Sequence, residues 1–383
     1  MKRTACIMDL KNIARRRVPK MFFDYVDGAA WTESTKNLNV EALNDIKFKQ
    51  RVAIDVSDRS AETNLIGSSF RLPLAMAPVG LTGVIWPNGE IITMKACEEF
   101  GIPYCLSTVS ITSLESLAKA ASKKFWFQLY VIRDRDFVKR LIQRAEAVGV
   151  ETLVLTLDLP LSGQRNRDIH NGLSAPPKPT IFNVIDILRR PAWCYEMLHF
   201  RNFNFGNLKG HVKNLENGKS LAEWTNEQYD PSLNWQDVKW IRDLWKGKLI
   251  LKGILSTEDA ETAIEVGADA IVVSNHGGRQ LDGAPATIQV LPDISSKIAG
   301  RCEILIDGGF TSGQDVFRAL ALGANGILMG RALIYGLGAG GQAGVQKALG
   351  FIAHELETTM GLCGVNSVSE IGPHNLYSKP VVR

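Results

Sequence analysis

The hydrophobic positions of this chain form short runs that alternate with amphipathic stretches. Eight apolar runs follow one another from residue 74 onward, and stretches with apolar residues at helical spacing, such as residues 257–266 and 313–322, lie between them. Short apolar runs predict buried strands, and strands that alternate with helices predict parallel pairing. The eight predicted strands are residues 74–77, 103–106, 125–129, 152–156, 249–251, 270–273, 303–306 and 326–329.

Eight strand–helix units predict an α/β protein with a closed (β/α)8 barrel of the TIM type. A doubly wound sheet is disfavoured because no GxGxxG follows the first predicted strand. We expect a single domain over residues 1–383, with a helical lead-in at 1–71 and the barrel at 72–361. Within the lead-in, the spacing of apolar residues predicts helix over 9–26.

One interval interrupts the strand–helix rhythm. Successive strands begin roughly twenty to thirty-five residues apart, but roughly a hundred residues separate the fourth strand from the fifth. We therefore expect an insertion over residues 176–230. Its segment 182–205 mixes aromatic and aliphatic residues with Arg189, Arg190 and Arg201. Such a mixture is typical of a segment that lies in a bilayer interface, and equally of a lid that buries its aromatics over the barrel mouth.

Composition narrows the class of protein. The 383 residues are 45% hydrophobic and 22% charged, with a formal net charge of +4 and no basic stripe interleaved with aromatics, so we expect no nucleic-acid partner. The six cysteines have no zinc-like spacing, which predicts no metal site and favours a reducing cytoplasmic setting. We expect no signal peptide and no membrane-spanning helix, because no apolar stretch reaches about eighteen residues.

Candidate chemistry lies at the carboxyl ends of the predicted strands. In a (β/α)8 barrel these ends meet at one rim, where active sites are built. Every predicted strand ends in, or is followed by, small or functional residues: Ala77, Pro78, Val79, Gly80, Ser107, Thr108, Gln128, Tyr130, Thr156, Asp158, Lys252, His276, Arg279, Asp307, Gly308, Gly309, Gly330 and Arg331.

Residues 271–283 are the most informative part of this rim. They pair a potential base, His276, with a permanent cation, Arg279, around two glycines. This pairing suits an anionic substrate from which a proton is taken, and the alternative is a glycine-rich turn with incidental polar residues. Asp158 is placed to orient His276 as a carboxylate orients a histidine base. Lys252 ends a strand, where its charge would stabilise negative charge on a bound cofactor.

The last two units predict a phosphate site, because Gly308, Gly309 and Gly330 leave backbone N–H groups accessible after the final strands. Oxidation of a 2-hydroxy acid at this rim would need a cofactor, since no amino-acid side chain readily accepts a hydride.

Nearly the whole chain resembles the FMN-dependent 2-hydroxy acid dehydrogenases and oxidases, and among them most closely the bacterial respiratory L-lactate dehydrogenases. The most specific stretch is Ser-Asn-His-Gly-Gly-Arg-Gln-Leu-Asp-Gly at residues 274–283. The other matching stretches are residues 77–80, 106–110, 126–130 and 320–331.

The resemblance implies a role for each rim residue. His276 would be the proton acceptor and Asp158 its partner. The substrate would be bound by Tyr25, Tyr130, Arg165 and Arg279, although Tyr25 taken alone reads as a core tyrosine. The residues implied to bind FMN are Ala77, Pro78, Val79, Ser107, Gln128, Thr156 and Lys252 at the ring, with Asp307, Gly308, Gly309, Gly330 and Arg331 toward the phosphate.

Two positions depart from the family pattern. Many members carry an arginine two residues after the Gly308–Gly309 pair, where this chain has Thr311. Val109 stands where some plant relatives have an indole, so the pocket wall differs from theirs.

The resemblance implies oxidation of L-lactate to pyruvate, with electrons passed through the flavin to a membrane quinone. It also implies peripheral contact with the cytoplasmic face of the inner (plasma) membrane and a homotetramer. Three alternatives stay open: a dehydrogenase for a bulkier acid such as (S)-mandelate, which residues 81–87 and 167–172 also resemble; a soluble oxidase that uses oxygen; and a non-catalytic membrane-surface or scaffolding protein that kept the barrel.

Overall fold

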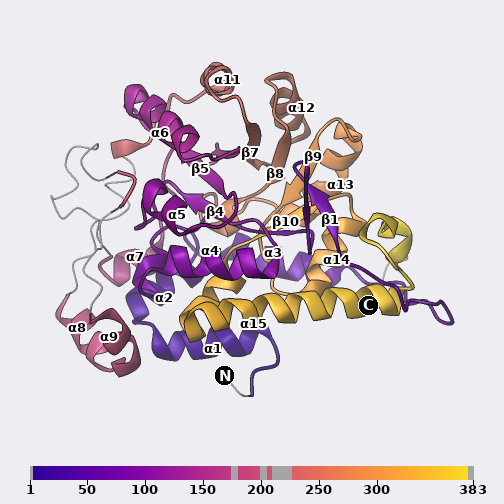
Figure 1. Cartoon of the computed structure of the whole chain (residues 1–383), viewed down its shortest axis with the longest axis horizontal. Coiled ribbons are helices and arrows are strands. Elements are labelled where there is room, and N and C mark those ends of the chain that lie inside the picture. The colour runs from indigo at the N-terminus through magenta and orange to yellow at the C-terminus, as the bar shows by residue number, and fades with distance from the viewer. Residues whose placement is uncertain (1–2, 174–179, 199–204, 209–226, 378–383) are drawn as a thin grey trace.

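The computed structural model describes residues 3–173, 180–198, 205–208 and 227–377, and its centre is a closed barrel of parallel strands (Figure 1). The strands pair in the order β3-β10-β9-β8-β7-β6-β5-β4, and a parallel bridge between Met76 and Tyr104 joins the two ends. The predicted (β/α)8 barrel is therefore confirmed. Its strands are β3 (Leu74–Met76), β4 (Cys105–Ser107), β5 (Trp126–Tyr130), β6 (Thr152–Thr156), β7 (Lys248–Ile254), β8 (Ala270–Val273), β9 (Glu303–Ile306) and β10 (Gly326–Met329).

Most predicted strand bounds agree with the structure to within a residue or two. The second strand begins two residues later than expected, at Cys105, and Pro103, which has no N–H for the ladder, stays outside it. The fifth is longer than expected because a register shift at Lys252–Ile254 lets β7 continue to Ile254. Such a bulge is not visible in an apolar run.

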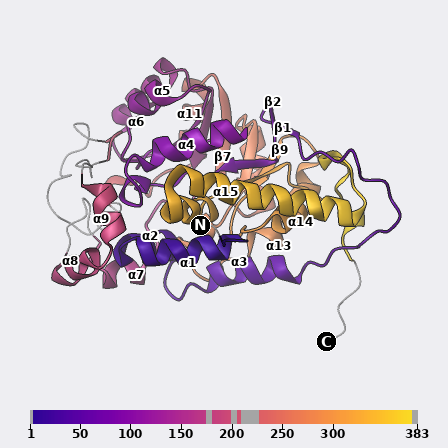
Figure 2. The same cartoon turned by 60° about the horizontal axis from the view of Figure 1, so that its bottom comes forward.

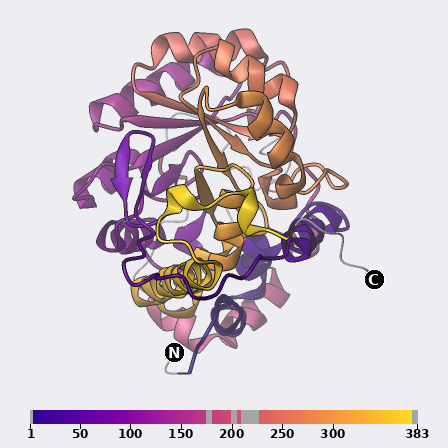
Figure 3. The same cartoon turned by 90° about the vertical axis from the view of Figure 1, so that its right-hand side faces the viewer.

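Helices surround the strands when the barrel is viewed from its end (Figure 3). The predicted helices at 257–266 and 313–322 are confirmed as α12 and α14, where Ser256 and Ser312 accept the capping hydrogen bonds. The helices around and after the barrel are α4 (Gly89–Phe100), α5 (Leu114–Ala120), α6 (Arg135–Ala147), α7 (Asn166–His170), α11 (Trp235–Leu244), α12 (Thr257–Glu265), α13 (Thr287–Ile298), α14 (Gly313–Ala321) and α15 (Arg331–Cys363), with short 3-10 turns η1 (Thr82–Val84), η2 (His276–Gly278), η3 (Val368–Glu370) and η4 (Pro373–Asn375).

Two hydrophobic layers hold the barrel. Strand residues such as Ala75, Val154 and Leu328 fill the interior, and their neighbours along each strand pack outward against the helices. The hairpin of β1 (Thr63–Leu65) and β2 (Ser68–Phe70) adds Leu65 to the interior layer. The amide of Ile66 also donates to Glu303, the first residue of β9, so the hairpin covers the amino-terminal end of the barrel.

The lead-in contains two helices where one was predicted over 9–26. These are α1 (Ile7–Arg17) and α2 (Lys20–Asp27), and a third helix, α3 (Ser34–Asp45), follows. The chain breaks at Val18, which is extended, because the following Pro19 disfavours helical backbone before it and lacks an N–H. As a result α1 packs along α15, while α2 runs to the carboxyl-terminal rim and carries Tyr25 there (Figure 1).

Of the predicted insertion, residues 180–198, 205–208 and 227–230 are described, and Phe200, Arg201, Phe203 and the proline-rich stretch at 176–179 lie outside the described residues. Helices α8 (Ile181–Leu188) and α9 (Pro191–Met197) lie at the corner of the molecule farthest from the β1–β2 hairpin (Figures 1 and 2). No helix in the described ranges is both long and apolar enough to cross a bilayer.

The bulge in β7 generates a stability prediction. Gly253 has φ +110°, and a Cβ added there would lie 2.7 Å from the Cβ of Asp158. We expect Gly253→Ala to lower the free energy of unfolding by more than about 1 kcal/mol, because both the backbone and the contact are strained. Gly350→Ala in α15 is the matched control: its added Cβ meets no atom within 4 Å, and helix propensity favours alanine. Equal stabilities of the two variants in denaturant unfolding would contradict this account.

Candidate active site

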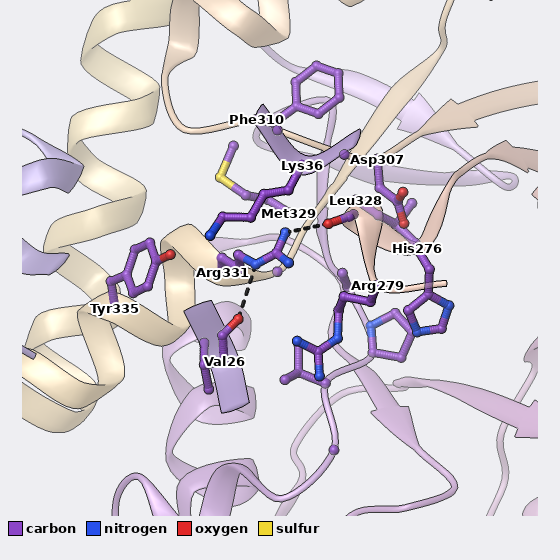
Figure 4. Close-up of a pocket in the computed structure, with 18 of the residues that line it drawn as sticks. Val26, Lys36, His276, Arg279, Asp307, Phe310, Leu328, Met329, Arg331 and Tyr335 are labelled. Atoms are coloured by element: carbon purple, nitrogen blue, oxygen red, sulfur yellow. Dashed lines mark hydrogen bonds between the residues drawn. The ribbon is translucent and has the colours of Figure 1, made fainter. Parts of the chain in front are cut away.

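A cavity of about 450 Å³ opens at the carboxyl-terminal rim of the barrel. Most of the predicted site residues line it together, and Figure 4 shows several of them converging from different strands and from the lead-in. Ser107, Gln128 and Asp158 are absent from the lining. The predicted residues that line the cavity are Tyr25, Ala77, Pro78, Val79, Tyr130, Thr156, Arg165, Lys252, His276, Arg279, Asp307, Gly308, Gly309, Gly330 and Arg331.

The loop after β8 holds His276 in a left-handed conformation. His276 has φ +57°, and Gly277 and Gly278 follow with φ +63° and +74°. A positive φ is unfavourable for a residue with a Cβ, and such strain persists only where surrounding contacts enforce it. Here the side chain of Asn275 accepts from the Gly278 amide and pairs reciprocally with Asn39 of α3, which holds the loop.

His276 forms a close pair with Asp158, which follows β6. The two atoms His276 Nδ1 and Asp158 Oδ1 are 2.8 Å apart. With the carboxylate accepting the Nδ1–H, the lone pair of Nε2 is free to act as a base. Gln280 donates to the Asp158 carbonyl at 3.0 Å and so helps to position the carboxylate from the same loop.

Burial and charge act in opposite directions on this pair. Burial lowers the pKa of His276 below its usual 6.5 and outweighs the attraction of Asp158. Burial alone would raise the pKa of Asp158, but His276 and Lys252 together keep it below its usual value. The histidine is therefore neutral and the aspartate charged near neutral pH, as a general base and its partner require.

Lys252 is a buried cation beneath the cavity. Its Nζ lies 3.0 Å from Asp307 Oδ2 and donates to Ser274 Oγ at 2.7 Å. Burial would lower the pKa of Lys252, but Asp307 and Asp158 raise it, so the ammonium stays charged. Ser274 also accepts from the backbone amide of His276, which links the lysine to the loop after β8 (residues 274–283).

Two guanidinium groups face the same part of the cavity. Arg279 donates to the carbonyls of Tyr25 and Gly28, and its guanidinium lies 5.0 Å from the centre of the Tyr25 ring. Burial, reinforced by repulsion from Arg165, lowers the pKa of Arg279 to about 10. Arg165 Nε is buried without a hydrogen-bond partner among the described residues. An anionic carboxylate bound here would relieve the repulsion and satisfy the free donor.

The insertion brings two aromatic residues to the cavity that were not among the predicted site residues. Phe205 and Tyr229 both line it, and the ring of Tyr229 lies 5.0 Å from that of Tyr130. Phe205 ends the segment 182–205, whose aromatic residues a lid over the barrel mouth would bury. No local pattern marked Tyr229, whose backbone pairs with Ile132 beyond the end of β5, because this contact joins segments about a hundred residues apart. The described ends of the insertion therefore form part of the pocket wall.

Buried polar atoms at the ends of β5 and β6 lack partners. Gln128 is fully buried, and its Nε2 and the Thr156 Oγ1 have no hydrogen-bond partner among the described residues. Ser107 donates to the other end of the Gln128 amide at 3.1 Å. Leaving such groups unpaired costs about 1–3 kcal/mol each. A planar ring with nitrogen and oxygen atoms along its edge, as in a flavin, fits these unsatisfied groups.

The predicted phosphate end is built from glycines and an engaged arginine. Gly308 and Gly309 have φ +101° and +86°, a conformation that glycine adopts without strain. Arg331 donates to the backbone carbonyl of Val26 (Figure 4) and to those of Gly277 and Gly28, at 2.8–3.1 Å. Arg331 thus connects the lead-in to the loop after β8. Two of its five N–H groups are left for another acceptor. Its contact with a phosphate stays a prediction.

The motif at 274–283 also has a structural part. Asp282 accepts hydrogen bonds from Thr32, Ser34 and Thr35, and these bonds lower its pKa. These hydrogen bonds hold the start of α3 against the loop after β8. The acidic residue of the motif therefore positions the lead-in and takes no part in the chemistry of the cavity.

Known proteins resemble this chain over nearly its full length. L-lactate dehydrogenase of Stenotrophomonas maltophilia is 43% identical over 373 residues, 97% of this chain and 98% of that protein. L-lactate dehydrogenase of Caulobacter vibrioides is 44% identical over 364 residues, 95% of each chain. The crystal structure of the monotopic membrane protein (S)-mandelate dehydrogenase matches with a TM-score of 0.92 at 35% identity, covering 98% of this chain and 100% of that one. Residues 14–378 match the family described as FMN-dependent dehydrogenase, so the chain belongs to this family of oxidoreductases and its cofactor is FMN.

Proposed function

We propose that this chain oxidises L-lactate to pyruvate and passes the electrons through FMN to a membrane quinone. The observation that carries the proposal is the 2.8 Å pairing of His276 with Asp158 in a cavity that also holds Arg279 and Lys252. The cavity offers one base and two guanidinium groups for a small anionic acid. The high identity to proteins named L-lactate dehydrogenase supports lactate as that acid.

The chain's own residues divide the reaction between them. Arg279 and Arg165 bind the substrate carboxylate, and Tyr130, which lines the same cavity, contacts a substrate oxygen. His276 Nε2 takes a proton from the substrate, and Asp158 stabilises the imidazolium that forms. When bound, FMN supplies the acceptor for the two electrons that leave the α-carbon. Lys252 holds a positive charge where negative charge develops.

We assign the flavin to the unsatisfied end of the cavity. The backbone of residues 77–79, Gln128, Thr156 and Lys252 would hold its ring, with Ser107 orienting the glutamine. Gly308, Gly309, Gly330 and Arg331, beside Asp307, would hold its phosphate.

A bulkier 2-hydroxy acid is the second candidate, because the structure with a TM-score of 0.92 to this chain is an (S)-mandelate dehydrogenase. Anaerobic mixing with L-lactate and (S)-mandelate in parallel separates the two by the rate at which the flavin absorbance bleaches. Release of hydrogen peroxide in air would instead favour an oxygen-using oxidase.

We propose that α8 docks on the cytoplasmic face of the inner membrane as a peripheral anchor. Its outer side chains are apolar and open to solvent: Phe182 is 81% exposed and Leu188 72%. The exposed Arg189 follows the helix, where a cation meets anionic lipid, whereas Arg190 is half-buried and pairs with Asp186 at 3.2 Å. The helix after it is held to the barrel, since Trp193 of α9 is buried and donates to the Val84 carbonyl at 3.0 Å. A firmly attached helix pair with one exposed apolar face is suited to interfacial docking.

A homotetramer is the assembly that the family resemblance favours. Light scattering of the purified protein, with and without detergent, measures the subunit number directly.

The histidine–aspartate pair generates the first functional prediction. His276→Ala and Asp158→Asn should retain FMN, while the rate of flavin reduction by L-lactate falls by about 10² to 10⁴, because the base is lost or held in the wrong tautomer. The exposed His374→Ala is the matched control and should reduce at the unaltered rate. Anaerobic stopped-flow absorbance measures all three. Reduction at the control rate in His276→Ala would refute the assigned role.

The pH dependence of kcat/KM follows from the same pair. The reaction needs neutral His276, so activity is present above its pKa and lost as the pH falls through it. Because burial lowers that pKa, the acid limb should have its midpoint below 6.5. Asp158→Asn removes a charge that raises the pKa of His276, so the limb of that variant should move to still lower pH. A wild-type midpoint above 6.5 would contradict the assignment.

Membrane docking by α8 is tested with Phe182→Ser/Leu188→Ser. Vesicles of phosphatidylethanolamine and phosphatidylglycerol should bind this variant at least tenfold more weakly, since each buried side chain of this size contributes about 1.5–3 kcal/mol. Val52→Ser/Leu362→Ser is the control, with residues 78% and 56% exposed elsewhere. Reduction of a soluble dye should be unchanged in both variants. Unaltered vesicle binding with lost dye reduction would favour a lid in place of an anchor.

A further inference from the structure

We propose that Lys36 of α3 supplies the cation that the FMN phosphate needs and that Thr311 cannot provide. The inference rests on the flavin site proposed above and names a binding residue within it. The arginine that many relatives carry two residues after the glycine pair is absent here, and Lys36 lines the same cavity from a different element.

Helix α3 packs against the two glycine loops that contain Gly278 and Gly309. A Cβ added at Gly278 would lie 2.6 Å from the Lys36 amide nitrogen, and one at Gly309 would lie 2.9 Å from Asn39. The first turns of α3 therefore lie directly on both glycine loops, and no side chain fits between them. In Figure 4 the Lys36 side chain runs between Phe310 and Arg331. Lys36 is thus placed at the end of the cavity assigned to the phosphate.

The loop after β9 offers no cation of its own. Thr311 donates through its backbone amide to Asp315 at 3.0 Å and so belongs to the cap of α14. Phe310 is apolar, and Arg318 in the same helix pairs with Asp315 at 2.9 Å and donates to the Ile46 carbonyl. Arg331 donates three of its N–H groups to backbone carbonyls. Lys36 adds a full charge on a flexible stem.

Lys36 shares its two carboxylate partners with other cations. Its Nζ lies 2.9 Å from Glu33 and 3.6 Å from Asp27, and burial lowers its pKa. Both carboxylates have other cations: Arg167 pairs with Glu33 at 2.6 Å and with Asp27 at 2.8 Å, and Lys11 pairs with Asp27 at 2.6 Å. Lys36 can therefore turn toward a phosphate without leaving either carboxylate unpaired.

Arg331 is a second cation beside Lys36, and its repulsion helps to lower the pKa of Lys36. A phosphate monoester carries about −1.5 to −2 charges at neutral pH, so a phosphate bound by both cations would relieve this repulsion. The carboxylates that line the cavity are engaged elsewhere: Asp307 pairs with Lys252, and Glu355 accepts from the Gly313 amide.

The test compares two flavins that differ only in the phosphate. Lys36→Met removes the charge and keeps the stem, and the dissociation constants of FMN and riboflavin for the apoprotein are measured by flavin fluorescence quenching. We expect the dissociation constant of FMN to rise about ten- to hundredfold, because a hydrogen bond to a charged group is lost, while that of riboflavin stays constant. Lys49→Met, which changes an exposed lysine, is the control and should bind both flavins like the wild type.

A second variant tests where the charge is needed. Thr311→Arg in the Lys36→Met background should restore FMN binding at least in part, because it puts a cation on the loop that carries one in many relatives. Unchanged FMN binding in Lys36→Met would overturn the proposal. Equal weakening of FMN and riboflavin would also overturn it, since the lysine would then act on the fold. A wild-type apoprotein that binds neither flavin would refute the flavin site itself.

Discussion

The contact between His276 and Asp158 depends on the order of the strands in the sheet more than on any local sequence. The two residues follow β8 and β6, which are separated in the sheet by β7 alone, and the register places Thr156 beside Lys252 and Lys252 beside Val272. The bulge at Gly253 then lets Asp158 approach β7 so closely that no side chain fits at that glycine. Base, carboxylate and buried lysine are thus brought together by strand order and one irregularity.

The amino-terminal segment completes the site from outside the barrel. Arg279 and Arg331 both donate to carbonyls of residues 25–28, so two cations of the rim also hold α2 in place. Asp282 holds the start of α3 in the same way. These contacts give Asp282 a structural reason for its charge, since it joins the lead-in to the loop after β8. The cavity therefore has one wall that is not part of the barrel.

The insertion serves two surfaces at once. Its described ends place Phe205 and Tyr229 in the wall of the cavity, while α8 presents exposed apolar side chains to solvent. The two possibilities raised by its composition, a lid and a bilayer segment, therefore concern different described parts of the insertion: Phe205 and Tyr229 meet the cavity, and α8 is exposed.

Much of this protein is determined by the local sequence. Apolar runs such as residues 152–156 and 270–273 form strands because burial is their most favourable state, and polar residues immediately after them must lie at the strand ends. Pro19 also marks the break between α1 and α2, although the spacing of apolar residues alone predicted a single helix. The motif at residues 274–283 placed His276 and Arg279 in one loop, and both line the cavity, because three residues of sequence separate them.

Other features were decided only by tertiary structure. The bulge in β7, the arrival of Tyr229 beside Tyr130, the use of Arg331 as a clamp on Val26, and the approach of Lys36 to the glycine loops all join segments far apart in the chain. No periodicity records such contacts, because their free energy arises from shape, burial and charge after the barrel has closed. Local sequence placed polar and charged residues at the strand ends, and packing of the folded chain left some of their buried groups, such as the Gln128 amide nitrogen, without a partner among the described residues.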